Sequence, residues 1–395
     1  MTQRQILVLS AARTPIGAFG GTLKDTPLAT LATTACSAAL TRSGVDPAEV
    51  GHVVMGNVIP TEPRDAYLSR VAAMDSGIPQ ETPAFNVNRL CGSGLQAIIS
   101  AAQAILLGDT DIAIGAGAEN MSRGPFMLPS MRWGARLGDH QVVDYMNGIL
   151  HDPWQRTHMG VTAENVASRY GISREMQDVL ALESQRRAAR ASAKGYFKGQ
   201  IVPVEIKTRR GTISFDSDEH IRPELTLEQL AGMKAVFLKE NGTVTPGNAS
   251  GLNDGAAALV LAEEQRVHTL GLEPLARLVG YAHAGVDPAY MGMGPVPAVR
   301  LVLQRCGLSM EQMDVIEANE AFAAQACAVT QELGMDPLKV NPNGSGISLG
   351  HPVGATGAII STKAIYELHR CGGRYALVTM CIGGGQGIAA IFERL

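Results

Sequence analysis

The chain carries little charge for its length and no cluster of positive charge. Only 18% of its 395 residues are charged, the formal net charge is -4 at pH 7, and Lys and Arg are scattered along the sequence. Nucleic-acid-binding domains concentrate basic residues on one face, so we expect no nucleic-acid partner. A few placed cations and helix N-termini can still bind a phosphate group, and the charge balance does not exclude phosphorylated small molecules.

The sequence also lacks paired metal-ligand motifs. Its six cysteines include no C-x-x-C pair, and no histidine stands at ligand-like spacing. We therefore expect reduced thiols in a cytoplasmic protein without a structural metal site. The N-terminal apolar run, residues 6–9, is too short for a signal peptide or a membrane-spanning helix, so we expect a first strand there and no membrane partner.

Small and apolar residues are abundant instead. Hydrophobic residues make up 46% of the chain and there are 44 glycines, which is typical of a compact α/β enzyme with many tight strand-to-helix turns. The length predicts two or three domains.

Apolar strands and helices alternate along the first 121 residues. The expected strands begin near residues 5, 53, 84 and 111, and the expected helices cover residues 28–40, 67–74 and 94–107. This alternation predicts a mostly parallel sheet with helices on both faces.

Residues 122–247 differ in character and interrupt this pattern. They contain both tryptophans, few strand-like repeats and an expected helix at 174–193 with Ser173 as its N-cap. We interpret the segment as an inserted loop domain that builds a binding surface. For residues 125–138 a packing or oligomer contact is an equally good interpretation.

A second round of alternating elements follows. Core-like sequence resumes at residue 248, and from residue 274 the chain has expected strands at 276–281, 315–318, 339–341, 375–381 and 387–393, with helices at 297–306, 320–333 and 354–370. The two rounds look like copies of one unit. We therefore divide the chain into an N-terminal half (1–121 with 248–273), the loop domain (122–247) and a C-terminal half (274–395).

Cys91 stands between an expected strand and an expected helix. The unpaired amides and the positive dipole end of that helix would point at its thiol and favour the thiolate, which is the nucleophilic form. Gly92 and Gly94 would let a substrate carbonyl approach the backbone. The alternative is that Cys91 is a small buried core residue.

Three further reactive groups stand at glycine-rich or strand-end turns of the second round. Asn319 can orient a water or support an oxyanion, or merely cap a helix. His351 can act as a base or be structural, and Cys381 precedes glycines whose amides could face a ligand or form a buried turn. Together with Cys91 they supply a nucleophile, a base, a proton-transferring thiol and oxyanion support, a set suited to acyl transfer followed by carbon–carbon bond formation.

These stretches resemble the thiolase family, in particular its biosynthetic-type acetyl-CoA acetyltransferases and broad-chain β-ketothiolases. The resemblance extends along essentially the whole chain, with matching motifs at residues 88–95, 158–160, 247–258, 319–323, 350–357 and 381–387. It implies a thiolase fold, in which two similar βαβαβαββ halves form a layered α-β-α-β-α core with an inserted loop domain. It also implies a homotetramer built as a dimer of dimers.

The resemblance further implies roles for individual residues. Cys91 would take up the acyl group, His351 would activate it and bind a thioester oxygen with a water on Asn319, and Cys381 would move the α-proton. The amides of Cys91 and Gly383 would form a second oxyanion pocket. No cofactor would be bound permanently; coenzyme A and acetyl-CoA would be substrates, contacted by Arg222, Ser250, Leu150, His158, Met159, Phe237 and Met291.

The implied activity is the ping-pong condensation of two acyl-CoA molecules to a 3-ketoacyl-CoA and the reverse thiolysis, in fatty acid metabolism or polyhydroxyalkanoate precursor synthesis. One departure bears on chain length, because residues 344–348 read Gly-Ser-Gly-Ile-Ser where many acetyl-specific members have Gly-Gly-Ala-Ile-Ala. We expect this change to reshape the acyl pocket for somewhat longer chains.

Other functions fit less well. A degradative 3-ketoacyl-CoA thiolase is the main alternative. A ketoacyl synthase would pair its cysteine with histidines where this chain has Cys381, and a non-catalytic acyl-CoA-binding protein need not keep all four reactive groups. A nicotinamide enzyme would need a complete G-x-G-x-x-G turn, which neither residues 115–117 nor 383–385 provide.

Overall fold

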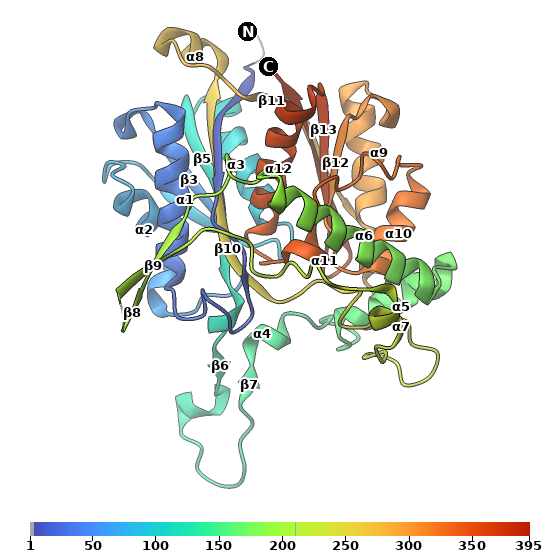
Figure 1. Cartoon of the computed structure of the whole chain (residues 1–395). Helices are drawn as coiled ribbons and strands as arrows, with labels where there is room; N and C mark the ends of the chain where they lie inside the picture. Colours follow the sequence, from blue (N-terminus) through green and yellow to red (C-terminus); the bar gives the residue numbers. More distant parts are fainter. Residues whose placement is uncertain (1–3, 210) are drawn as a thin grey trace.

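The computed structural model describes residues 4–209 and 211–395 and is built on one mixed sheet (Figure 1). Its strands are β1 Ile6–Arg13, β2 Gly17–Ala18, β3 His52–Gly56, β4 Ala84–Val87, β5 Ile112–Asn120, β10 Asn253–Glu263, β11 Ala276–Gly285, β12 Val315–Ala318, β13 Tyr375–Ile382 and β14 Gln386–Arg394. They are ordered β12-β13-β14-β11-β1-β10-β5-β3-β4, with β2 beside β10.

The sheet repeats one pattern in each half of the chain. In the N-terminal half β4, β3 and β5 are parallel, and β10 and β1 follow antiparallel. In the C-terminal half β12 and β13 are parallel, β14 and β11 follow antiparallel, and Val340 bridges Ile316 where β4 would stand. The halves join where β1 pairs with β11. The expected duplication of one unit is confirmed.

The expected direction of the strands is wrong. Among the described strands of the main sheet only three pairings, β3–β4, β3–β5 and β12–β13, are parallel. A local reason is visible in the C-terminal half. β13 and β14 are joined by a short glycine turn, and a connection that short can only join antiparallel neighbours.

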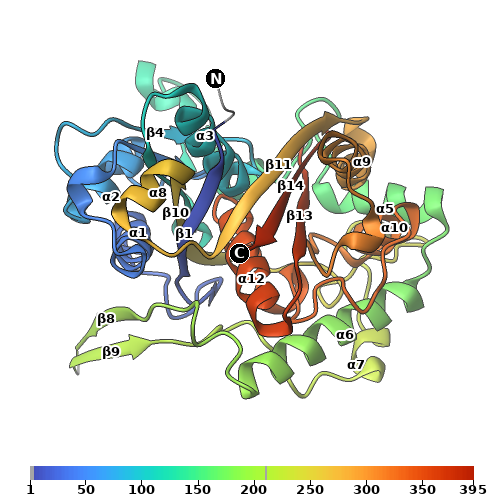
Figure 2. The ribbon, with the colours of Figure 1, turned by 90° about the horizontal axis from the view of Figure 1, so that it is seen from above.

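The core has five layers (Figure 2). The N-terminal and C-terminal halves of the sheet form two of them, and helices form the other three. α1 Leu28–Ser43 and α2 Leu68–Asp75 cover the outer face of the N-terminal half, and α9 Pro295–Cys306 and α10 Ala323–Glu332 cover that of the C-terminal half. α3 Ser93–Leu107 and α12 Thr356–Cys371 pack on each other and on the sheet in the middle layer. The layered thiolase-type architecture is therefore present.

α3 is the most apolar helix of this core. Residues Leu90–Leu107 are long and apolar enough to cross a membrane by composition, and theirs is the one such helix in the described part of the chain. Its side chains Leu95, Ile98 and Ile105 are fully buried among those of the middle layer, which accounts for its hydropathy. Gly108, with φ 85°, ends the helix in the left-handed conformation that glycine adopts readily.

The inserted segment lies against both halves rather than forming a separate core. Its elements are β6 Phe126–Met127, β7 Val143–Asp144, α4 Tyr145–Gly148, α5 Met159–Tyr170, α6 Arg174–Ala193, β8 Val204–Thr208, β9 Gly211–Phe215 and α7 Leu227–Ala231. α6 has the predicted bounds, and Ser173 Oγ caps it by accepting from the Met176 amide at 3.2 Å. β6 and β7 form the base of an arm that projects away from the core (Figure 1).

Two short helices and several 3-10 turns complete the described chain. The helices are α8 Glu264–Leu270 and α11 Gly346–Leu349, and the 3-10 turns are Pro47–Glu49, Pro63–Tyr67, Met121–Arg123, Pro129–Trp133, Pro288–Met293 and Met310–Gln312. α11 leads directly into the turn that carries His351.

Candidate active site

A strained turn presents Cys91 between β4 and α3. Leu90, just before it, has φ 44°, a left-handed conformation that costs a non-glycine residue roughly 1–2 kcal/mol. Ser93 holds the turn, because its Oγ donates to the Leu90 carbonyl at 2.6 Å and accepts from the Arg89 amide at 2.9 Å. Gly92 has no room for a side chain, since a Cβ there would lie 2.6 Å from Ile382 Cδ1.

His351 occupies the corresponding turn before α12. Its amide donates to Asn253 Oδ1 at 2.9 Å, and its Nδ1 lies 2.7 Å from Thr356 Oγ1. The Thr356 hydroxyl also lies 2.9 Å from the Pro352 carbonyl, and while it donates there its oxygen accepts from Nδ1–H. In that arrangement the neutral imidazole carries its proton on Nδ1 and leaves Nε2 free to accept one.

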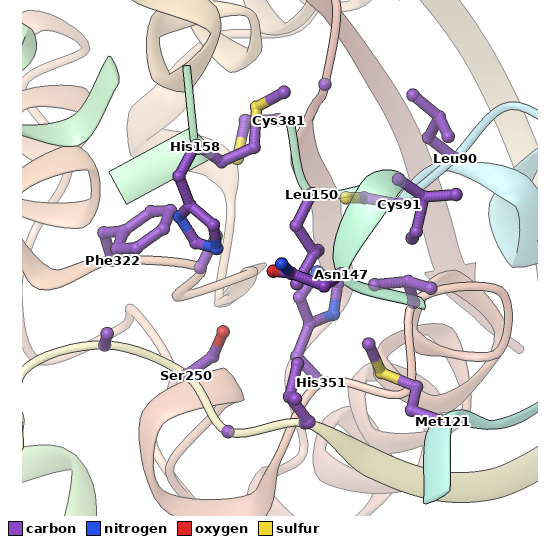
Figure 3. Close-up of a pocket in the computed structure, with 18 of the residues that line it drawn as sticks. Leu90, Cys91, Met121, Asn147, Leu150, His158, Ser250, Phe322, His351 and Cys381 are labelled. Carbon is purple, nitrogen blue, oxygen red and sulfur yellow. The ribbon is translucent and has the colours of Figure 1, made fainter. Parts of the chain in front are cut away.

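Both turns open onto one cavity of about 310 Å³ (Figure 3). Cys91 enters from the N-terminal half, and His351, Cys381 and Gly383 enter from the C-terminal half. The walls are mostly apolar and include Leu90, Met121, Leu150 and Phe322 (Figure 3). Residues far apart in the sequence thus surround a space from which water can be largely excluded.

The electrostatics of Cys91 differ from the expectation. Although the sulfur is reached from the cavity, burial raises the pKa of the Cys91 thiol to about 11, and the N–H groups of Gly383 and of Cys91 itself only partly oppose this. The nearby amides do favour the thiolate as predicted, but burial has the larger effect on the thiol pKa. Loss of hydration disfavours the thiolate more than the nearby amides stabilise it.

The other two reactive groups are also held neutral. Burial lowers the pKa of His351 to about 4, so its imidazole is an unprotonated base at neutral pH. Burial and the neighbouring Cys91 raise the pKa of the Cys381 thiol well above its usual range. The mutual influence of the two sulfurs follows from their closeness in the cavity.

Asn319 lies behind the cavity rather than in its wall. It follows β12 directly, and its Nδ2 is 3.4 Å from His351 Nε2. Its Oδ1 is buried and has no hydrogen-bond partner within residues 4–209 and 211–395. The amide of Asn319 therefore contacts Nε2 of His351, the ring nitrogen that faces the reaction.

Most of the residues proposed for coenzyme A contact also reach the cavity. The lining includes Leu150, His158, Met159, Phe237, Ser250 and Met291. The rings of His158 and Phe237 stack with centroids 4.6 Å apart, and Gly160 permits this because a Cβ there would overlap the Phe237 ring. Arg222 is outside the lining; its amide donates to Gln185 Oε1 at 2.7 Å, and its proposed contact stays a prediction.

Several lining residues were not singled out from the sequence. Phe322 and Val353 lie within the recognised motifs, and their apolar character at glycine-rich turns was an available signal. Asn147 comes from the four-residue helix α4 and Val58 from the segment after β3, where the sequence offers no such signal.

The two serines within residues 344–348, where the sequence differs from many acetyl-specific members, lie away from the cavity. Ser348 Oγ is 2.8 Å from Ser184 Oγ on α6, and neither Ser345 nor Ser348 is in the lining. The expectation that they reshape the acyl pocket directly is not supported by their position. No group of three or more His, Cys, Asp and Glu side chains arranged for a metal ion occurs in the part of the chain that the structure describes.

Comparison with known proteins covers the whole chain. Family models for the thiolase N-terminal domain and the thiolase C-terminal domain match residues 6–265 and 272–394. The chain is 64% identical to the β-ketothiolase BktB of Cupriavidus necator over 99% of its length and 100% of the relative. It is 47% identical to the acetyl-CoA acetyltransferase of Chromobacterium violaceum, with coverage of 99% and 100%.

Solved structures agree with the sequence comparison. The crystal structure of human mitochondrial 3-ketoacyl-CoA thiolase in complex with CoA superposes with a TM-score of 0.96 at 44% identity, over 100% of this chain and 98% of that one.

Proposed function

Since the chain belongs to the thiolase family, we propose that it is a β-ketothiolase, an acyl-CoA:acetyl-CoA C-acyltransferase. It condenses two acyl-CoA molecules to a 3-ketoacyl-CoA and coenzyme A, and it catalyses the reverse thiolysis. The observation that carries this proposal is that Cys91, His351 and Cys381 line one apolar cavity.

The first half-reaction transfers an acyl group to Cys91. Nε2 of His351 accepts the thiol proton while the sulfur attacks the thioester carbonyl, and coenzyme A leaves as a thiol with the proton of Cys381. A protonated His351 and a Cys381 thiolate remain. With pKa values of about 11 for Cys91 and about 4 for His351, complete proton transfer in the empty site is strongly uphill, so it accompanies the attack. The N–H groups of Cys91 and Gly383, which lie near the sulfur, are placed to stabilise the oxyanion.

The second half-reaction forms the carbon–carbon bond. Cys381, as the thiolate left when its proton departs with coenzyme A, removes the α-proton of a second acyl-CoA. The resulting carbanion attacks the acyl group on Cys91, whose sulfur leaves and takes the proton that His351 holds. The thioester oxygen of that acyl-CoA accepts from Nε2–H of the protonated His351, and Asn319 Nδ2 lies 3.4 Å from the same nitrogen. A thiol base can act on such a weak acid only where the enolate oxygen is held by aimed donors in a dry site.

Thiolysis of a 3-ketoacyl-CoA series from four carbons upward tests the activity. We expect ping-pong kinetics and an acyl group trapped on Cys91, detected by peptide mass spectrometry after reaction with acetyl-CoA. An acyl label on another residue would contradict the assigned nucleophile.

We propose a broad acyl range rather than strict acetyl specificity. The proposal is supported by the apolar walls of the cavity and by 64% identity to a protein named β-ketothiolase. Turnover of acetoacetyl-CoA without turnover of 3-ketovaleryl-CoA or 3-ketohexanoyl-CoA would remove it. A degradative 3-ketoacyl-CoA thiolase is the alternative, which the human mitochondrial relative favours; it would prefer the longest chains of the series.

A cytoplasmic role in fatty acid metabolism or polyhydroxyalkanoate precursor synthesis completes the proposal. Two free thiols in one cavity fit a reducing compartment. Cell fractionation tests the location. A deletion strain that makes 3-ketoacyl-CoA and its products at the parental rate would contradict the metabolic role.

We further propose that the protein is a homotetramer built as a dimer of dimers. The arm formed by residues 124–144 exposes large apolar side chains, among them Phe126, Met131, Trp133 and Leu137. A projecting apolar surface of this kind is typical of a protein–protein contact. Light scattering of the intact chain should give a tetramer, and a variant with residues 126–143 replaced by a short Gly-Ser turn should give a smaller assembly; equal masses would contradict the proposed role of the arm.

A further inference from the structure

Glu119 is a fully buried carboxylate close to the cavity that the mechanism above does not use. It lies near the C-terminal end of β5 and has no exposed surface. Burial raises its pKa to about 8, although several backbone N–H groups act in the opposite direction. Removing a carboxyl group from water is unfavourable unless hydrogen bonds compensate for the lost hydration.

Four N–H donors surround this carboxylate. Oε1 accepts from Asn57 Nδ2 at 2.8 Å and from the Ile59 amide at 3.0 Å. Oε2 accepts from the Val58 amide at 3.1 Å and from the Gly354 amide at 2.8 Å. Each oxygen thus takes two hydrogen bonds, which is the arrangement of a carboxylate, since a protonated oxygen would face a donor with its own hydrogen.

These donors come from both halves of the chain. Asn57, Val58 and Ile59 follow β3 in the N-terminal half, whereas Gly354 belongs to the turn between His351 and α12 in the C-terminal half. Glu119 is therefore a bridge between the turn that carries His351 and the opposite wall of the cavity.

The bridged segments line the substrate cavity. Val58 and Val353 are both in its wall, and they pack in one apolar cluster with Met121, next to Leu90 and Cys91. Moving either segment would change both the room beside Cys91 and the position of the imidazole.

The contact between the His351 turn and β5 is close enough that only glycine fits at two positions. A Cβ on Gly354 would lie 2.5 Å from Glu119 Oε2, and a Cβ on Gly117 would lie 2.4 Å from the Gly354 carbonyl. The backbone of the His351 turn thus sits directly on the end of β5, at a separation that the carboxylate determines.

The internal repeat gives an independent reason to connect Glu119 with the chemistry. Gly56 pairs with Gly117 on β5, and in the other half Ala318 pairs with Thr379 on β13. Glu119 lies two residues beyond the first position and Cys381 two residues beyond the second, and each is opposite a glycine, Gly255 or Gly387, on the next strand.

The same comparison relates the two asparagines. Asn57 follows Gly56 as Asn319 follows Ala318. The pair Asn57–Glu119 therefore occupies in one half the site that Asn319 and Cys381 occupy in the other.

We propose that Glu119 is a positioning residue that sets the distance between the His351 turn and the Val58 wall, and thereby the acyl chain length that Cys91 accepts. It does so without touching the substrate: its four hydrogen bonds fix Gly354 and residues 57–59, and these carry Val353 and Val58. The inference rests on the proposed thiolase activity.

The test replaces Glu119 by Gln. The side chain keeps its size, but its NH2 group must face two N–H donors, so one of the two segments has to move. For thiolysis we expect kcat to fall by about tenfold or more, since small misplacements of reacting groups have large effects. The ratio of kcat/KM between the four-carbon and six-carbon 3-ketoacyl-CoA should change by about threefold or more, because the wall moves with the turn.

Two further variants keep the test decisive if Glu119→Gln folds poorly. Gly354→Ala forces the same contact apart from the other side, and Asn57→Ala removes one donor only. Both should shift the chain-length ratio in the same direction as Glu119→Gln. Because they act through one contact, Gly354→Ala combined with Glu119→Gln should be little worse than either alone.

Glu367→Gln is the matched control. Glu367 is a buried carboxylate on α12 that accepts from Asn343 Nδ2 at 2.7 Å and pairs with Arg370, and none of the three lines the cavity. This variant should lose thermal stability. Its kcat for thiolysis and its ratio of kcat/KM between the four-carbon and six-carbon substrates should stay within about twofold of the parent values.

Either of two kinetic results would overturn the proposal. One is an unchanged chain-length ratio in both Glu119→Gln and Gly354→Ala. The other is a kinetic loss in Glu367→Gln equal to theirs.

A separate readout distinguishes failure of this inference from failure of the proposed activity. The rate at which iodoacetamide alkylates Cys91 needs no turnover. At pH 9, above the pKa of Glu119, removing the charge near the thiol and loosening the wall should raise that rate by about threefold or more in Glu119→Gln. A parent protein without thiolysis would refute the proposed activity, whereas an alkylation rate equal to that of the parent would refute the role of Glu119.

Discussion

Nδ1 of His351 lies 2.7 Å from Oγ1 of Thr356, five residues along the same turn. While that hydroxyl donates to the Pro352 carbonyl, it accepts from the imidazole and favours the tautomer with its proton on Nδ1. Thr356 therefore helps to keep Nε2 of the base free, although it is outside the cavity lining.

Replacement of Thr356 by Val should impair catalysis. The buried Nδ1–H would lose its partner, and the other tautomer, with a proton on the catalytic nitrogen, would become competitive. We expect kcat for thiolysis to fall roughly tenfold to a hundredfold, with a smaller effect on KM. Thr356→Ser keeps the hydroxyl and should retain most of the activity; equal losses in the two variants would contradict a role in tautomer selection.

The two sulfurs should be separable by their half-reactions. Cys91→Ala should abolish both acyl-enzyme formation and turnover. Cys381→Ala should form acyl-Cys91 with acetyl-CoA more slowly, because it lacks the proton that coenzyme A takes up on leaving, and should lose condensation, because it lacks the base for the α-proton. Mass spectrometry of the acylated protein and a steady-state assay check both outcomes. Complete failure of Cys381→Ala to acylate would contradict this separation.

The pH dependence of alkylation should reflect the buried thiol. With the Cys91 pKa at about 11, the thiolate fraction is small at neutral pH and grows throughout the alkaline range. The rate of iodoacetamide labelling at Cys91 should therefore rise about tenfold per pH unit between pH 7 and 10. Peptide mapping separates it from exposed Cys371. A plateau near pH 7 would indicate a thiolate already formed in the empty site.

Acid should weaken the fold through buried histidines. His158, His220, His283 and His351 have pKa values lowered to about 4, mainly by burial, whereas an unfolded histidine titrates near 6.5. Below pH 6.5 the unfolded state binds protons at these histidines that the folded state does not, so their contribution to stability is full above pH 6.5 and falls as pH drops toward 4. The raised pKa values of Glu119 and Glu317, about 8 and about 7, act in the opposite direction and make this fall smaller than four histidines alone would give. Urea denaturation across this range measures it; a midpoint independent of pH would contradict the prediction.

Ser348 offers a test of what controls chain length. Its hydroxyl contacts Ser184 on α6, and Ser184 in turn donates to Glu320 at 2.6 Å. Ser348→Ala should therefore lower stability by about 1 kcal/mol and leave the ratio of kcat/KM between four-carbon and six-carbon substrates unchanged. Met291→Ala, which enlarges the cavity, is the positive control. A changed ratio in Ser348→Ala would restore a direct role for the 344–348 stretch.

Sequence reasoning was sufficient for local and repeated features. Glycine-rich turns next to reactive residues indicated Cys91, His351 and Cys381, and the structure brings these three to one cavity. The helix with Ser173 as its cap was readable because capping and apolar periodicity are local signals.

Features that depend on distant neighbours were not readable. Strand direction depends on how elements connect across the sheet, which is why the expected parallel sheet was wrong. The sign of the pKa shift at Cys91 depends on burial by residues from both halves, not on the adjacent helix alone. Glu119 gave no signal either, because its donors lie near residue 58 and at Gly354.

The two halves join through the sheet and through the middle helices. β1 and β11 pair at two positions among the described residues, Leu7 with Arg277 and Val8 with Ala276, and α12 packs on α3 as well as on β10 and β5. Cys91 and His351 stand at the starts of those two helices. A cut in the connection after α8 would thus leave two fragments, one with the acyl acceptor and one with its base, and reassembly of the fragments could be followed directly as recovered turnover.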